Sequence, residues 1–290
     1  MMFKSRSLRG PFRFMHGNIL VFSVTDLLGN FCRGMVFPYA SLYILALGGD
    51  ATRIGWVNSL APLAGLLIFP IAGYITDHAS RVRLILLANC LSAFILVMYV
   101  LAPSWEVIAV ATLLQGFMVF SFPAYSALIA DSLSPEDRGK GIAAMNTVSS
   151  TLAIIAPYIA GAAIDSYGAN MGMRMLYGAM MVSSLASIVI FLHFLKETSL
   201  PSGERLKISD LPRVLKDAYG GISTTLRQLP PSLRALTGVI ILSFMANGIA
   251  GPFWVVYAVE HIGLSSTEWG LILLIETALK TLMFIPAGML

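Results

Sequence analysis

Long apolar runs dominate this sequence and limit the folds that it can adopt. A helix rises about 1.5 Å per residue, so about 20 apolar residues are needed to cross the roughly 30 Å hydrocarbon core of a bilayer. Of the 290 residues, 57% are hydrophobic and only 12% are charged. Because lipid offers no partner to an open strand edge, the runs are expected to be helices. We predict an all-α polytopic membrane protein with spans at approximately 18–46, 52–76, 83–102, 105–130, 139–165, 173–196, 235–260 and 266–290.

The basic residues indicate how these spans are oriented. If the N-terminus is cytoplasmic, 15 of the 19 Lys and Arg residues fall on the cytoplasmic side, whereas only Arg53 and Arg174 fall outside. This is the positive-inside bias of membrane proteins, so the net charge of +4 indicates topology and not a nucleic-acid surface. We therefore expect a multi-pass protein of the cell membrane with its N-terminus in the cytoplasm.

An internal repeat divides the chain into two parts. A shift of 214 residues superposes Gly34 on Gly248 and Pro38 on Pro252, and a shift of 215 aligns the following span in the same way. This ordered series predicts two halves related by a parallel repeat, with residues 1–196 forming a six-helix half and 235–290 beginning the second half. The last residue corresponds to Ile75, inside the second span, so we expect the second half to be truncated after helix 8.

Residues 197–234 form a long polar linker between these parts, unlike the short loops elsewhere. Within the linker, Leu211, Val214 and Leu215 fall at one-face helical spacing, and Gly220 with Gly221 can end a helix. The pattern favours a short amphipathic helix on the cytoplasmic membrane surface, and a docking site for a partner is the alternative.

Two charged loops carry a family pattern. The sequences are "GYITDHASRVR" after the second span and "ALIADSLSPEDRGKG" after the fourth. They resemble the major facilitator superfamily, whose corresponding segments read G-x-x-x-D-R/K-x-G-R/K-R/K and D-x-x-x-x-E-x-R-G. The matching residues are Gly73, Asp77 and Arg81 in the first loop and Asp131, Glu136, Arg138 and Gly139 in the second. The first loop departs from the pattern at His78, Ser80 and Val82.

The resemblance implies a major facilitator-type bundle of twelve helices, of which this chain holds the first eight. It also implies that the two loops form a cytoplasmic gate. Opposed charges near the membrane surface can hold helix ends together in one state and release them in another. The acidic and basic residues of these loops suit that role and would stabilise the outward-facing form. The alternative is that their basic residues only set topology.

Two further patterns of the family match in part. The sequence "TLLQG" keeps Gln115 and Gly116 of R-x-x-Q-G, with Thr112 where the pattern has arginine. The sequence "APYIAG" keeps Pro157 and Gly161 of the antiporter pattern G-P-x-x-G-G. The second match gives modest support to antiport.

Charged side chains within apolar spans cost free energy unless they are paired, neutralised or hydrated. Asp26, Asn30 and Arg33 lie on one face of the first span, and Glu276 and Lys280 form an i, i+4 pair in the eighth. We predict that these residues line a pathway for substrate or protons, with the two carboxylates as proton-coupling candidates. Charge pairs with a structural role are the alternative. Neutral contacts to the pathway are expected from Gln115 and Asn247.

Together these features predict a secondary active transporter of small molecules that works by alternating access. An apolar interior favours proton-coupled efflux of amphipathic or hydrophobic compounds. Proton-coupled uptake of a sugar or an organic acid, whose carboxylate Arg33 could hold, is the alternative. A non-transporting membrane receptor or membrane enzyme is the alternative of another class, but the sequence shows no catalytic set, no metal-ligand pattern and no P-loop. We expect no cofactor and no nucleic-acid partner, and the oligomeric state stays open.

Overall fold

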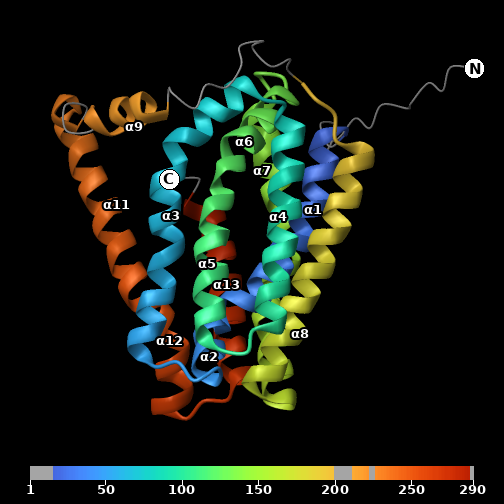
Figure 1. Cartoon of the computed structure of the whole chain (residues 1–290), viewed down its shortest axis with the longest axis vertical. Helices are drawn as coiled ribbons and strands as arrows, with labels where there is room; N and C mark the ends of the chain where they lie inside the picture. Colours follow the sequence, from blue (N-terminus) through green and yellow to red (C-terminus); the bar gives the residue numbers. More distant parts are fainter. Residues whose placement is uncertain (1–15, 199–210, 222–225, 288–290) are drawn as a thin grey trace, which may run out of the picture.

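The computed structural model describes residues 16–198, 211–221 and 226–287, and these ranges are helical, with no β-strand among them. Figure 1 shows the long helices side by side in one bundle. In the described ranges, six helical segments are long and apolar enough to cross a membrane. They are Asn18–Ala46, Ala51–His78, Arg81–Leu101, Trp105–Asp131, Leu152–Phe194 and Pro231–Ile262. The first four agree with the predicted spans to within about three residues.

The helices α1 to α8 form what we call the first bundle. Its members are α1 (Asn18–Val36), α2 (Ala40–Ala46), α3 (Ala51–His78), α4 (Arg81–Leu101), α5 (Trp105–Phe117), α6 (Phe122–Asp131), α7 (Arg138–Ser150) and α8 (Ala156–Phe194). The remaining membrane segments, which we call the second group, are α11 (Pro231–Ala250), α12 (Trp254–Val256) and α13 (Ser266–Ala287). The predicted eighth span corresponds to α13.

Proline residues interrupt several of these spans. Pro38 lies in a 3-10 turn between α1 and α2, and Pro252 lies in a 3-10 turn between α11 and α12. A proline removes a backbone donor and bends the helix around it. These two prolines superpose in the sequence repeat, and the structure has the same local break at both positions.

The fifth predicted span, 139–165, consists of α7, a 3-10 turn and the start of α8, and the sixth, 173–196, lies in the rest of α8, because α8 reverses direction at Gly168. This residue has φ 79° and ψ 158°, a conformation that favours glycine. A Cβ atom at Gly172 would lie 3.0 Å from the Cα atom of Ile164, so the segments before and after the break lie against each other. Residues 166–172, which lie between the fifth and sixth predicted spans, therefore contain a sharp break of the helix at Gly168 and no long loop. Arg174 secures it by donating to Val100 O at 2.8 Å and Ala102 O at 2.5 Å, at the end of α4.

The two ends of the bundle differ in which segments they hold. Residue 16, the helix α9 (Leu211–Gly220) and the start of α11 lie at one end, which we call the linker end, and α12 and the start of α13 lie at the other, the far end (Figure 1). Helix α9 lies where the linker helix was predicted, and its Tyr219 hydroxyl donates to Leu66 O of α3. Ser209 and Asp210 precede this helix in the sequence and have side chains of the type that caps a helix, but they lie outside the described residues.

Buried apolar side chains form two clusters in the first bundle. One surrounds Phe22 and Leu128 toward the linker end, and the other surrounds Tyr39, Tyr43 and Met173 toward the far end. Between these clusters, the middle of α1 carries the charged residues that the sequence analysis selected. The fold therefore places these charges between the two buried apolar clusters, where a polar pocket can form.

Candidate functional site

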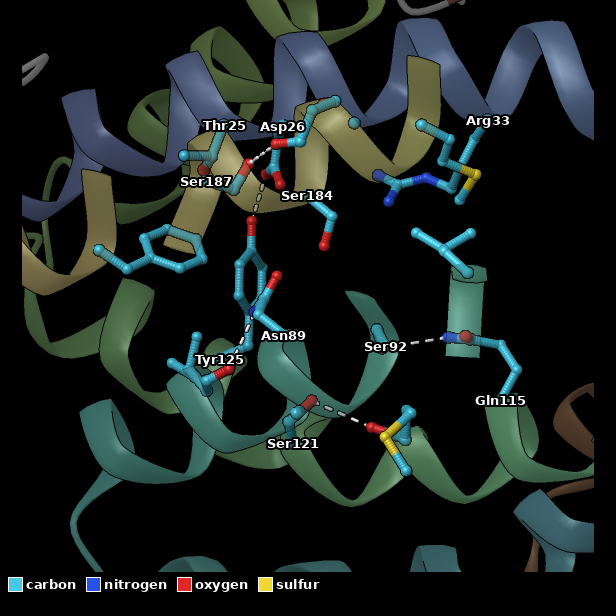
Figure 2. A pocket seen from close by; sticks show the side chains of 18 of the residues that line it. Thr25, Asp26, Arg33, Asn89, Ser92, Gln115, Ser121, Tyr125, Ser184 and Ser187 are labelled. Atoms are coloured by element: carbon cyan, nitrogen blue, oxygen red, sulfur yellow. Dashed lines mark hydrogen bonds between the residues drawn. The ribbon is translucent and has the colours of Figure 1, made fainter. Parts of the chain in front are cut away.

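A pocket of about 470 Å³ occupies the interior of the first bundle. Its walls come from α1, α4, α8, the end of α5, the start of α6 and the segment that joins them, and Figure 2 shows its side chains. Asp26 and Arg33 both line it, together with Gln115, as do apolar residues such as Leu96 and Met180. This volume lies within the usual range for small-molecule sites, and the mixture of charged, polar and apolar groups is typical of them.

Asp26 projects from α1 toward α6. Its carboxylate accepts a hydrogen bond from the Tyr125 hydroxyl, as Figure 2 shows. The Tyr125 ring is fixed by an edge contact with Phe22, at 4.6 Å between ring centroids, and Phe22 in turn contacts Phe191 of α8 at 5.8 Å. Aromatic packing on the linker-end side thus holds the phenol against the carboxylate.

Arg33 lies two turns further along α1 and has a different partner. Its guanidinium donates to Asn30 Oδ1 at 2.6 Å, and Asn30 Nδ2 donates to Ser149 O of α7 at 3.3 Å. A Cβ atom at Gly29 would lie 3.3 Å from Arg33 Nη1, so the guanidinium folds back to the level of Gly29. Asp26 and Arg33 therefore share the pocket while each is hydrogen-bonded to another side chain.

The polar walls contain residues that the sequence analysis missed. Tyr125, Asn89 and the serines at 183, 184 and 187 all line the pocket. The three serines come from α8, and their spacing places them on one face of this helix. The sequence signal for these residues was their polarity within an otherwise apolar span. This signal is weak, because a hydroxyl group can form a hydrogen bond to its own helix and is then buried at little cost in free energy.

Of the other predicted pathway residues, some lie in the pocket and some lie outside it. Gln115 is in the pocket and donates to Ser92 Oγ at 3.3 Å. Asn247 is exposed on α11, and Glu276 and Lys280 form an exposed ion pair on α13 with 2.5 Å between Oε1 and Nζ. None of these three lines the pocket. Asn30, on α1, is absent from the pocket lining and instead bonds to Arg33. The predicted set thus divides into Asp26, Arg33 and Gln115 in the pocket, Asn30 beside Arg33, and three residues on the second group of helices.

The family of the chain follows from comparison with known proteins. The model of the Major Facilitator Superfamily matches residues 23–290. The chain belongs to this superfamily. The maltose permease of Geobacillus stearothermophilus is 36% identical over 102 residues, which are 34% of this chain and 25% of that protein. A multi-drug resistance efflux pump PmrA homolog of Lactococcus lactis subsp. lactis (strain IL1403) is 26% identical over 165 residues, 55% of this chain and 40% of that protein.

Solved structures agree with this assignment at the level of the fold. The crystal structure of the nucleoside transporter NupG aligns with a TM-score of 0.64 at 14% sequence identity, over 93% of this chain and 67% of that one. The two curated relatives are matched over a quarter and two-fifths of their own lengths. The all-α major facilitator fold predicted from the sequence is confirmed.

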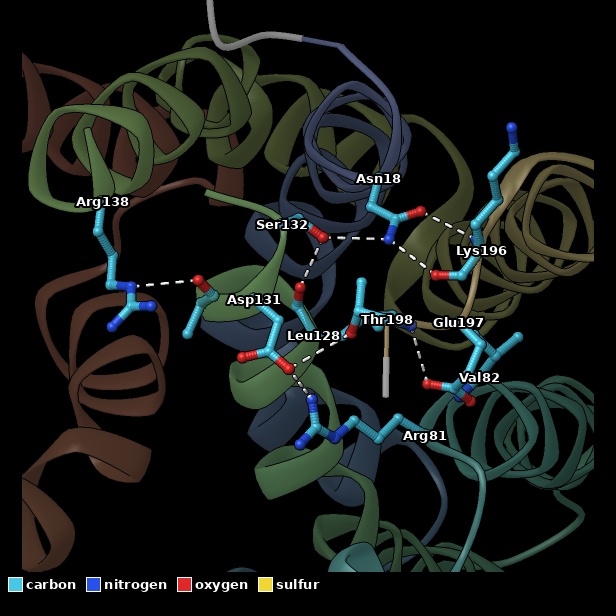
Figure 3. A network of polar contacts seen from close by, with 11 residues as sticks. Asn18, Arg81, Val82, Leu128, Asp131, Ser132, Arg138, Lys196, Glu197 and Thr198 are labelled. Carbon is cyan, nitrogen blue, oxygen red and sulfur yellow. Dashed lines mark hydrogen bonds and ion pairs between the residues drawn. The ribbon is translucent and has the colours of Figure 1, made fainter. Parts of the chain in front are cut away.

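The residues of the predicted gate lie at the linker end, and two of them, Arg81 and Asp131, are in contact there. Arg81, at the start of α4, forms an ion pair with Asp131, at the end of α6, and Thr198 Oγ1 lies 3.5 Å from the same carboxylate (Figure 3). Ser80 donates to Glu197 Oε2 at 2.5 Å. These contacts join α4, α6 and the segment after α8. All of them lie within the first bundle.

The other gate residues have separate positions. Arg138 donates to Ala130 O at 3.1 Å, which ties the start of α7 to α6. Asp77 is exposed in the last turn of α3, and Glu136 is exposed in the turn before α7. Gly73 and Gly139 have no atom within 4 Å of the position that a Cβ would occupy, so no close approach of another helix explains them here.

A second set of polar contacts lies at the far end and joins the first bundle to α13. The Asp165 carboxylate accepts from Ser266 N at 2.9 Å, Thr267 N at 2.8 Å and Thr267 Oγ1 at 2.6 Å. These are free N–H groups at the start of α13, so Asp165 caps that helix from another helix. The sequence analysis did not select Asp165, since nothing in its local pattern identifies a partner 101 residues away.

Small residues allow this contact to be close. A Cβ atom at Gly161 would overlap Ser266 O, and one at Gly270 would lie 2.5 Å from Pro157 O. The Tyr39 hydroxyl lies 2.8 Å from Pro157 O and 2.9 Å from Ser266 O. Glycines at helix contacts permit close backbone approach in membranes. Gly161, from the partial antiporter pattern, therefore has a visible packing role.

Proposed function

We propose that this chain forms part of a proton-coupled secondary transporter that works by alternating access. Membership of the superfamily supports transport of a small molecule across a membrane. The observation that carries the proton coupling is Asp26, a carboxylate in a membrane-length helix that faces a polar pocket and bonds to Tyr125. Ionisable side chains inside membrane spans are costly and are typical of proton and substrate pathways.

The arrangement of the two helix groups supports alternating access. The far end holds α13 on the first bundle through Asp165 and the glycine contacts, whereas nearly all of α11 is exposed. If the basic residues place the N-terminus in the cytoplasm, this arrangement is closed to the outside and corresponds to an inward-facing state. Transport then requires the far-end contacts to separate in the opposite state.

Asp26 suits a proton carrier because its surroundings change its preference for charge. A carboxylate away from bulk water favours its protonated form, whereas a nearby cation or a hydrogen-bond donor favours the charged form. Arg33 and the Tyr125 hydroxyl supply the second influence. A movement of α1 relative to α6 would alter that balance, and so would couple proton uptake to conformation.

Two substrate classes are compatible with the residues of this pocket. Efflux of amphipathic compounds is favoured by the apolar pocket residues beside the polar ones, and one relative is named a multi-drug resistance efflux pump homolog. Uptake of a sugar or an organic acid is favoured by the guanidinium of Arg33 in the pocket, and another relative is named a maltose permease.

The test uses the full-length protein in proteoliposomes with an imposed pH gradient. We expect Asp26→Asn to abolish transport driven by the gradient while solute exchange across the membrane continues, because the amide cannot carry a proton. Asp50→Asn is the matched control, since Asp50 is exposed at the start of α3 and lies outside the pocket. A normal response of Asp26→Asn to the gradient would exclude Asp26 as the proton carrier.

A further inference from the structure

The two opposite charges of the pocket are arranged for a ligand that carries both. Asp26 and Arg33 line one cavity, and the structure shows each bonded to a neutral side chain, Tyr125 and Asn30. Figure 2 shows both side chains projecting from α1 into the space between the helices. An ion pair between them would have closed this space, and the observed bonds keep the charges apart.

The distance between the charges limits the size of the ligand. Asp26 and Arg33 are seven residues apart, which is roughly 10 Å along a helix axis. The guanidinium, however, folds back to the level of Gly29, which is three residues or roughly 4.5 Å from Asp26 along that axis. Groups that bind the two charges must therefore be separated by only a few bonds. A long-chain ligand with distant charges does not fit this arrangement.

The wall around Asp26 favours a donor-rich group. Thr25 donates its hydroxyl proton to Val21 O at 3.0 Å, and Ser187 donates to Ser183 O at 2.9 Å. Asn89 Nδ2 donates to Ile85 O at 2.8 Å. Because the hydroxyl protons of Thr25 and Ser187 are used by their own helices, these two groups present oxygen lone pairs to the pocket, and Asn89 keeps its amide oxygen as a further acceptor. An ammonium group, with three donors and a positive charge, matches such a wall and the Asp26 carboxylate.

The other side of the pocket favours an anion and an apolar substituent. Within the described residues, Arg33 uses one guanidinium nitrogen on Asn30, and its remaining donors have no protein partner. A planar guanidinium matches a carboxylate with two parallel hydrogen bonds. Leu96, Met118 and Met180 also line the cavity and can hold an apolar side chain.

We propose that this pocket binds a short amphipathic zwitterion of the amino-acid type, with its ammonium group on Asp26 and its carboxylate on Arg33. This inference rests on the proposed transport function and names the substrate class of the same site. A proton on Asp26 removes the negative charge that holds the ammonium group. Proton and ligand therefore compete for one carboxylate, which gives the site a means of coupling them.

The experiment measures equilibrium binding to the purified full-length protein with three matched probes. They are L-phenylalanine, phenethylamine, which lacks the carboxylate, and 3-phenylpropanoate, which lacks the amine. We expect L-phenylalanine to bind at least about tenfold more tightly than either single-charge probe, because each of these leaves one partly buried charge of the pocket without its partner. Equal affinity for all three probes, or no binding of L-phenylalanine, would overturn the proposal.

Variants assign each charge to its residue. Asp26→Asn should remove the preference over 3-phenylpropanoate, and Arg33→Gln should remove the preference over phenethylamine. Arg33→Lys keeps the charge and should retain part of that preference, which protects the test against a variant that fails to fold. Asp50→Asn and Arg53→Gln make the same charge changes in an exposed pair outside the pocket and should leave all three affinities unchanged. Unaltered preferences in both pocket variants would contradict the assignment.

The outcomes separate this inference from the proposed function. Selective binding of L-phenylalanine by a protein whose transport ignores a pH gradient would overturn proton coupling and leave the ligand class standing. Transport of a solute without an amine under a pH gradient, with no binding of L-phenylalanine, would overturn the ligand class and leave the proposed function standing.

Discussion

The linker end and the far end of the bundle both carry charged contacts, but these contacts join different parts of the molecule. At the linker end, Arg81 and Asp131 connect helices of the first bundle to each other. At the far end, Asp165 connects the first bundle to the N-terminus of α13. A contact between helices of the first bundle does not depend directly on how this bundle moves relative to the second group of helices. The family motif therefore marks one end, whereas the contact between groups is made at the other.

The exposure of the contacts also differs. Arg81 and Asp131 have side chains that are 19% and 41% exposed, and exposed ion pairs contribute little to stability. At the far end, Ser266 is only 4% exposed and lies against the backbone of α8, so the contact there depends on packing as well as charge. Three variants test this contrast.

Gly161→Ala should have the largest effect. The added methyl group would overlap the backbone of Ser266, which cannot move without displacing the start of α13. We expect the free energy of unfolding to fall by about 1–3 kcal/mol, as is usual for overpacking, with a melting temperature lower than that of the wild type in the same detergent. Gly178→Ala, also in α8 but with open space at its Cβ, is the control and should change little. A melting temperature equal to that of the control would show that α13 does not pack here.

Asp165→Ala should have an intermediate effect on stability and a clear effect on conformation. It removes the carboxylate that accepts two backbone N–H groups and one hydroxyl of α13, which should cost about 1–2 kcal/mol, as for other helix caps. We expect the far end to open more often. A cysteine at the buried position Ser266, in a background with the exposed Cys90 replaced by serine, would report this as faster labelling. Asp165→Asn keeps one acceptor oxygen and should fall between wild type and alanine.

If labelling at position 266 were as slow in Asp165→Ala as in the wild type, the cap would have no part in closing the far end. The comparison between the two ends would then rest on glycine packing alone.

Arg81→Gln should have the smallest effect. Its ion pair with Asp131 is partly exposed, so we expect a loss of at most about 1 kcal/mol. Labelling at position 266 should stay at the wild-type rate, because the pair joins helices of the same bundle. A labelling rate as fast as that of Asp165→Ala would break the comparison and return the linker-end pair to the role of a gate between states.

The pocket was predictable in part. Asp26, Arg33 and Gln115 could be selected because charged and amide groups are rare in apolar spans, and all three line the cavity. Tyr125 could not be selected, because tyrosine is common in membrane helices and its partner lies 99 residues away. The same reasoning selected Glu276 and Lys280, which lie apart from the pocket on α13. Rarity in a span identifies a costly residue but not the cavity that accommodates it.

The sequence by itself determined the class of this protein, its family and the approximate positions of its helical spans. These follow from local properties, since hydrophobic length and basic flanks act over a few residues of the same helix. Only the tertiary structure decided that Asp26 and Arg33 face one pocket without pairing, and that Asp165 caps α13. Those facts depend on which helix faces lie against each other. Packing sets these contacts between residues about a hundred positions apart, and no local pattern records them.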